Sequence, residues 1–122
     1  MVRQHSMGRR SQVAALSAAA AVTAVLFIDL CGVVFGCGCE SLWRDAALAC
    51  NIHNPTGPHC PWCAHPFTAG ATAFMGTVAV QAGLIVGPMP FGILTRFALA
   101  LPAVPGVAGI LGLLQGVWYG YW

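Results

Sequence analysis

Three long apolar runs restrict what this chain can fold into. The first extends from Val13 to Phe35 and is interrupted only by single polar side chains. As a helix it would measure roughly 34 Å, which is enough to cross a bilayer core of about 30 Å. Residues 68–87 and 97–118 form two further runs of similar character. The sequence therefore predicts an all-α integral membrane protein with three transmembrane helices, at about 13–35, 68–87 and 97–118.

Composition supports a membrane location and excludes nucleic-acid binding. Hydrophobic residues make up 58% of the chain and charged residues only 7%, whereas soluble domains average about 25% charged residues. The net charge of +2 comes from scattered arginines, which is too weak a pattern for a nucleic-acid partner. We expect a tail at 1–12, a single membrane domain at 13–122, and the lipid bilayer as the main surrounding.

The arginines predict how the helices are oriented. Arg3, Arg9 and Arg10 precede the first helix and Arg96 lies between the second and third, while only Arg44 lies on the other side. The positive-inside rule then places the N-terminus on the cytoplasmic side of a cell (inner) membrane. The loop at 37–66 and the C-terminus become extracytoplasmic. A cleaved signal is the alternative for the first run, but signal cores are shorter, at about 7–15 residues.

Proline and glycine spacing predicts how the helices bend and pack. Pro102 and Pro105 should kink the third helix in its first half. GxxxG motifs occur in or at the end of every predicted helix, at 32–36, 83–87 and 112–116. Such motifs allow helices to approach closely in lipid. They predict a compact bundle, and also contact with a membrane-protein partner or a second copy of the chain.

Asp29 is a candidate relay residue inside the first helix. Its carboxyl group would lie roughly 9 Å below the outer end of the helix. An ionisable group at that depth is costly and commonly functional. Asp29 shares a helix face with Gly32 and Gly36, and Cys31 points roughly the opposite way. The alternatives are a packing hydrogen bond, or transfer of a proton or metal ion beneath the loop.

The extracytoplasmic loop concentrates cysteine and histidine. Five of the six cysteines and three of the four histidines lie within it. Trp43, Ala47 and Cys50 recur at helical spacing, so a short surface helix is expected that turns Cys50 towards the membrane. Trp62, inside the stretch HCPWCAH, is expected to anchor the loop at the membrane interface.

A transition-metal site is the first interpretation of this loop. Cys60 and Cys63 form a CxxC pair, and Cys37 and Cys39 could complete four thiolate ligands. Two flanking imidazoles, those of His59 and His65, are further candidates. Thiolate and imidazole ligands suit copper or zinc. The expected role is metal acquisition, transfer or sensing.

Two other interpretations remain open. Disulfide bonds could clamp the loop of an accessory subunit in a larger membrane complex. Alternatively, the Cys60–Cys63 pair could exchange thiols and disulfides, because the CPWC stretch resembles the dithiols of thioredoxin-like oxidoreductases. The βαβ context of that fold is absent, so a quinone-linked membrane bundle, such as those of the disulfide-bond formation and vitamin K epoxide reductase families, is the nearer analogy. Those families have a four-helix core.

Several catalytic motifs are missing. A covalent haem needs CxxCH, and here Ala64 occupies the position of the histidine. Neither a nucleotide-binding motif nor a serine-hydrolase motif occurs in the sequence. A binding role is therefore favoured over an enzymatic one.

Overall fold

The computed structural model describes residues 8–122, and this part of the chain is helical without any strand. Three segments in it are long and apolar enough to span a membrane: Arg9–Phe35, Pro66–Val86 and Ile93–Trp118. The predicted all-helical architecture with three such helices is confirmed. Of the predicted N-terminal tail, residues 1–7 lie outside the described residues, and the first helix already begins at Arg9.

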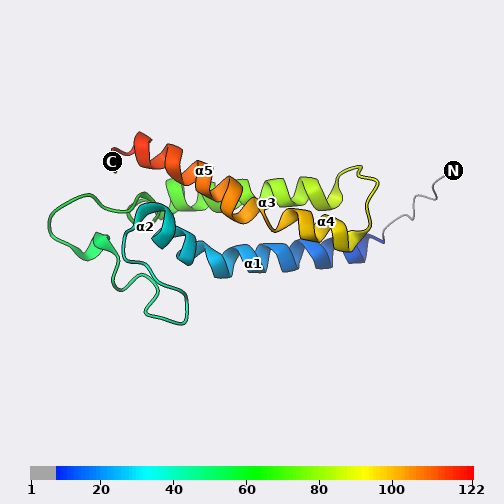
Figure 1. Cartoon of the computed structure of the whole chain (residues 1–122), viewed down its shortest axis with the longest axis horizontal. Coiled ribbons are helices and arrows are strands. Elements are labelled where there is room, and N and C mark those ends of the chain that lie inside the picture. The colour runs from blue at the N-terminus through cyan, green and yellow to red at the C-terminus, as the bar shows by residue number, and fades with distance from the viewer. Residues whose placement is uncertain (1–7) are drawn as a thin grey trace.

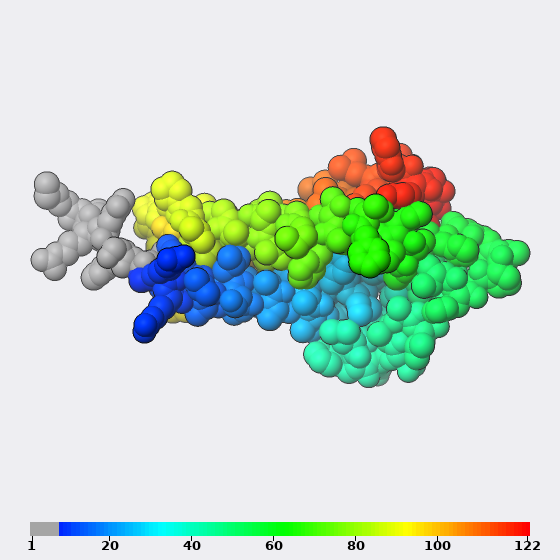
Figure 2. All heavy atoms as spheres, turned by 180° about the vertical axis from the view of Figure 1, so that it is seen from behind, coloured from blue at the N-terminus to red at the C-terminus, as the bar shows by residue number. Residues whose placement is uncertain are grey.

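The helices form one elongated bundle. Its spans consist of α1 (Arg9–Phe35), of η2 (Pro66–Gly70) with α3 (Ala71–Val86), and of α4 (Ile93–Ala100) with α5 (Ala103–Trp118). The long loop between α1 and η2 carries η1 (Asn51–His53) and α2 (Pro61–Ala64). Figure 1 shows α1 and α3 side by side, with α4 and α5 packed along them. The loop and the C-terminus share one end, where the loop forms a bulge (Figure 2).

The third span is broken where its prolines predict a kink. The helix α4 ends at Ala100, and α5 begins at Ala103, after a turn at Leu101 and Pro102. Proline lacks the N–H that would continue the helical ladder and clashes with the preceding turn. Within the turn, the Val104 N–H donates to Leu101 O (3.0 Å). The Ala100 carbonyl is thereby left free for another donor.

A buried glutamine uses that free carbonyl to connect the three spans. Gln81 of α3 donates from Nε2 to Ala100 O (3.3 Å) and accepts at Oε1 from the Thr23 hydroxyl of α1 (3.0 Å). Both side chains are fully buried. These contacts satisfy polar groups that would otherwise be unpaired in the centre of the bundle.

We expect Gln81→Leu to lower the free energy of unfolding by about 1 kcal/mol, the usual size of interhelical hydrogen bonds in membranes. The loss should appear in reversible denaturation of the detergent-solubilised protein. Gln12→Leu is the matched control, since Gln12 lies near the start of α1 and makes no side-chain hydrogen bond to another helix within residues 8–122. Equal stability of both variants would contradict the role given to Gln81.

Arg96 is buried and fixes the turn between α3 and α4. Only 6% of its surface is exposed, and its guanidinium donates to the carbonyls of Ile85 (2.9 Å), Gly87 (2.6 Å), Met89 and Phe91 (2.9 Å). A cation at the C-terminal end of a helix satisfies carbonyls that lack a helical partner. This turn lies at the same end of the bundle as the start of α1, away from the loop (Figure 1).

The GxxxG glycines mostly serve turns and loop contacts within this chain. Gly36 ends α1 in a left-handed conformation (φ 57°), and Gly87 ends α3. Gly112 of α5 packs closely on Trp62. A Cβ at this position would lie 3.0 Å from the indole and 3.0 Å from a methyl group of Val34, so a larger residue would disturb the contact. The predicted contact of these motifs with a partner or a second copy stays a prediction.

Candidate metal centre

All six cysteines of the chain meet at the loop end of the bundle. Cys31 comes from the last turns of α1, and the other five come from the loop. Their sulfurs lie close enough to form groups of potential metal ligands. Five of the six residues are at most 8% exposed, and Cys63 is half-buried. The residues are Cys31, Cys37, Cys39, Cys50, Cys60 and Cys63.

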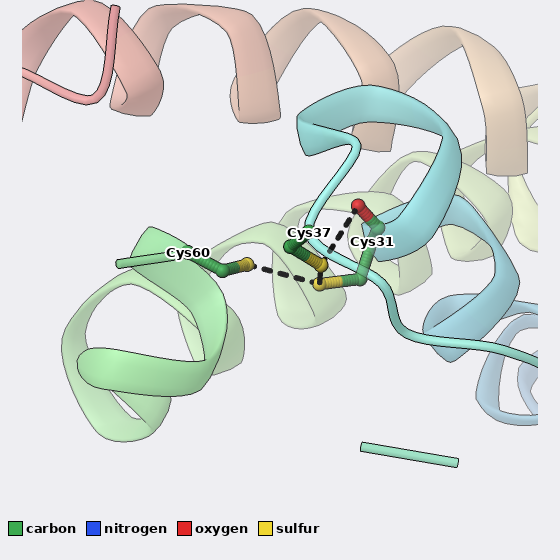
Figure 3. A group of neighbouring side chains, drawn as sticks. All are labelled: Cys31, Cys37 and Cys60. Atoms are coloured by element: carbon green, nitrogen blue, oxygen red, sulfur yellow. Dashed lines mark hydrogen bonds between the residues drawn. The ribbon is translucent and has the colours of Figure 1, made fainter. Parts of the chain in front are cut away.

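Cys31 lies close to four of the other cysteines. Its Sγ is 3.0 Å from that of Cys60, 3.5 Å from Cys37, 3.8 Å from Cys63 and 3.9 Å from Cys39. Figure 3 shows the sulfurs of Cys31, Cys37 and Cys60 directed towards one another. All six cysteines are free thiols, so the described residues hold no disulfide.

Three of the sulfurs form a nearly equilateral triangle. The edges are 3.9 Å between Cys31 and Cys39, 3.8 Å between Cys31 and Cys63, and 3.8 Å between Cys39 and Cys63. With metal–sulfur bonds of about 2.3 Å, sulfurs around one ion are about 3.8 Å apart in a tetrahedral site and about 4.0 Å apart in a trigonal one. The triangle therefore already has the size of a metal-binding site.

Glycines allow the chain to fold back onto α1. Gly36 and Gly38 have positive φ angles of 57° and 89°, a backbone conformation that residues other than glycine rarely adopt. A Cβ on Gly32 would overlap the carbonyl oxygen of Cys39, and one on Gly38 would overlap that of Ala49. The pattern CGxxxGCGC at 31–39 thus combines thiols with glycines that bring the thiols together.

Asn51 holds several parts of the loop in register. Its backbone N–H donates to Cys37 O (2.8 Å), and its Oδ1 accepts from the Cys60 N–H (2.7 Å). Its Nδ2 donates to the Tyr121 hydroxyl (2.8 Å), which in turn donates to Phe35 O (2.7 Å). One side chain therefore connects two cysteine segments, the C-terminus and the end of α1.

We expect Asn51→Ala to weaken metal binding by about 10–100-fold, the usual effect of removing a residue that orients metal ligands. The variant loses the bond to Cys60 and leaves Tyr121 with one partner fewer. Competition titration with a metal chelator measures the change. Asn54→Ala is the control, because Asn54 is exposed in the same loop. Equal affinities for both variants would contradict this role of Asn51.

Trp62 anchors the CPWC segment by being buried in the bundle. It is only 4% exposed, and its ring stacks on Phe27 with centroids 4.3 Å apart. Its indole N–H donates to Gln115 Oε1 (2.7 Å), and Gln115 Nε2 donates to Ala69 O (3.0 Å). Trp62 therefore anchors the segment through contacts inside the bundle, where its ring contacts and a polar partner satisfy the indole. Its predicted position at the membrane interface stays a prediction.

The candidate histidines lie away from the sulfurs. His59 is exposed with Nε2 3.0 Å from Asn54 O, and the exposed His65 stacks on Tyr119 with ring centroids 4.5 Å apart. Asp29 is half-buried in α1. Within residues 8–122, no group of potential metal ligands includes any of these three side chains. Metal binding by the histidines and a relay through Asp29 stay predictions.

The sulfurs' surroundings favour a bound cation. Hydrogen bonds from the Cys31 and Cys60 thiols lower the pKa of Cys63, which favours a thiolate at this position. Burial raises the pKa of Cys39. The hydrogen-bond partners of the sulfurs in the described residues are other sulfurs, Cys31 O and Asn51 Oδ1. Further thiolates would repel one another without a positive ion between them.

Cys31 and Cys50 were not among the ligands predicted from the sequence. Cys31 lies within the first apolar run, but it is only six residues before the CGC motif at 37–39 and therefore comes close to the loop. Cys50 was expected on a surface helix, but residues 42–49 form successive turns instead, with positive φ at Asp45 (53°) and Ala46 (44°). That expectation was wrong because those conformations interrupt a helix. Cys50 is in fact 1% exposed within the cluster.

Comparison with known proteins does not assign the chain to a family. No protein-family model, curated protein or solved structure matches the chain. The features that indicate a function are therefore the sulfur cluster and the apolar bundle that carries it.

Proposed function

We propose that this chain is a membrane-anchored copper(I)-binding protein and that its six-cysteine cluster is the binding site. One observation carries the proposal: every group of potential metal ligands in the described residues consists of three cysteines and no other residue type. Soft thiolates select copper(I), which accepts three ligands. Zinc in structural sites is almost always four-coordinate, and no fourth side chain of another type joins these groups.

The size of the sulfur triangle also supports a metal ion. Its edges of 3.8–3.9 Å between Cys31, Cys39 and Cys63 require little movement to surround an ion with bonds of about 2.3 Å. A site that is formed before binding loses less conformational entropy when the ion enters.

The outer surface of the bundle supports insertion into a bilayer. Large apolar side chains point outward along the helices, among them Val33 (80% exposed), Leu94 (81%) and Ile110 (61%). In water, such a surface would be an aggregation risk, whereas lipid solvates it. Arg9, Arg10 and Arg96 lie at the end away from the cluster. With that end in the cytoplasm, the cluster would face the extracytoplasmic side.

Cys63 provides a route for copper transfer. It is half-buried, while the other five cysteines are buried. An ion can therefore first bind the Cys63 thiolate and then exchange ligands with the deeper sulfurs. The reverse exchange would pass copper(I) to a partner that offers its own thiolates. Acquisition and transfer fit this arrangement, and bound copper(I) would also protect the thiols from oxidation.

The proposal is tested on the full chain, purified without oxygen in mild detergent. Thiols are counted by alkylation and mass spectrometry, and copper(I) is titrated against a chromophoric copper(I) chelator, with zinc as a competing ion. We expect six free thiols and copper(I) binding that excess zinc does not displace. Failure of the reduced protein to bind copper(I) would overturn the proposal. If the cysteines are oxidised and no metal is bound, the result would instead favour a disulfide clamp or a thiol–disulfide relay.

A further inference from the structure

The six sulfurs are arranged in four overlapping groups. The sulfurs of each group all lie within 4.8 Å of one another. The groups are Cys31, Cys37 and Cys60; Cys31, Cys39 and Cys63; Cys37, Cys39 and Cys50; and Cys50, Cys60 and Cys63. Every cysteine belongs to two groups, and any two groups share one cysteine. A single-ion site with spare thiols nearby would not need this regular sharing.

This sharing has the connectivity of a tetrahedron. Four groups correspond to its four vertices, and six shared sulfurs correspond to its six edges. If one ion occupied each group, every ion would have three thiolate ligands, and every thiolate would bridge two ions. Three thiolates suit a soft monovalent ion such as copper(I). Trigonal bonds of about 2.3 Å need sulfurs about 4.0 Å apart, and the sulfur–sulfur distances around Cys31 are 3.0–3.9 Å.

We infer that the cluster holds four copper(I) ions bridged by all six cysteine thiolates. This inference rests on the proposed copper function and adds the number of ions and the role of each sulfur. Six thiols release their protons to solvent and bind four monovalent ions, so the cluster carries a net charge of minus two. Copper stays in the cuprous state throughout, and no electron is transferred.

Zinc does not satisfy the same arrangement. Four zinc ions would each require a fourth ligand, and the four groups contain only cysteine. His59 and His65 could supply nitrogen only after leaving their contacts with Asn54 O and Tyr119. Four copper(I) ions therefore match the donor set as it is arranged.

Cys50 distinguishes four ions from one. It is not part of the equilateral triangle of Cys31, Cys39 and Cys63, which could hold one ion alone. It does belong to two of the four groups. In a four-ion cluster, Cys50→Ser removes a bridging sulfur from two ions, whereas a single ion at the triangle would be retained.

The test is native mass spectrometry of the full chain in detergent during anaerobic titration with copper(I) supplied as its acetonitrile complex. We expect wild-type protein to bind four copper ions, and Cys50→Ser to bind fewer. Asn54→Ala is the loop control and should still bind four. A wild-type maximum of one, two or three ions would overturn the four-ion cluster and leave the copper function standing. No bound copper at all would overturn both. The number of copper ions bound by the wild-type protein tests the four-ion cluster by itself, even if the Cys50→Ser protein does not fold.

Discussion

Gly32→Ala is expected to abolish copper binding while leaving the three-helix bundle in place. The added Cβ would overlap the Cys39 carbonyl oxygen, which is backbone and cannot rotate away as a side chain does. The CGC segment would then have to leave α1 and carry Cys37 and Cys39 away from Cys31. Because alanine favours helix over glycine by about 1 kcal/mol, α1 itself should not be weakened.

The measurements are copper(I) competition titration and circular dichroism of the same sample. Gly83→Ala is the matched control, since a Cβ on Gly83 of α3 would meet nothing within 4 Å. The control should bind copper as the wild-type protein does. Wild-type copper affinity in Gly32→Ala would contradict the close approach of the CGC segment to α1.

Cys31→Ser should cause a large loss of copper(I) affinity. The Cys31 sulfur lies within 3.9 Å of four other cysteine sulfurs, and its 3.0 Å distance to Cys60 is short. Serine keeps the size and hydrogen-bonding capacity of the side chain but supplies a hard oxygen that binds copper(I) poorly. Removal of an orienting residue such as Asn51 should lower the affinity about 10–100-fold. The loss of affinity in Cys31→Ser should be larger than that.

Val33→Ser is the control for placing serine on the same part of α1. Val33 is 80% exposed, so copper affinity should be unchanged in Val33→Ser. Equal copper affinities for Cys31→Ser and Val33→Ser would show that α1 contributes no ligand. The loop cysteines would then be sufficient.

The helices could be predicted from sequence because their determinants are local. Apolar runs long enough to span a bilayer became the three candidate spans. The break at Pro102 followed from the missing proline N–H. What could not be predicted was the pairing of Gln81 with the carbonyl that this break sets free. That contact depends on how α3 and α4 pack.

The convergence of the cysteines was foreseen in part. The four cysteines of the two pairs, Cys37, Cys39, Cys60 and Cys63, do converge, but Cys31 and Cys50 join them through long-range folding. Chain reversal at Gly36 brings the loop onto Cys31, and Asn51 aligns the segment that contains Cys60.

The histidines lay close to the cysteines in sequence and therefore looked like ligands. Local geometry turns their rings elsewhere, to a backbone carbonyl for His59 and to an aromatic ring for His65. Proximity in sequence could not indicate the direction of a side chain.

Copper K-edge X-ray absorption on the full chain, loaded anaerobically with copper(I), measures the ligands of the bound ions. We expect three sulfur scatterers around each copper ion, because every potential ligand group consists of three cysteines. A shell that contains histidine nitrogen would contradict the all-thiolate site and favour His59 or His65 as ligands. Copper that is lost from the reduced protein on gel filtration would contradict copper binding itself.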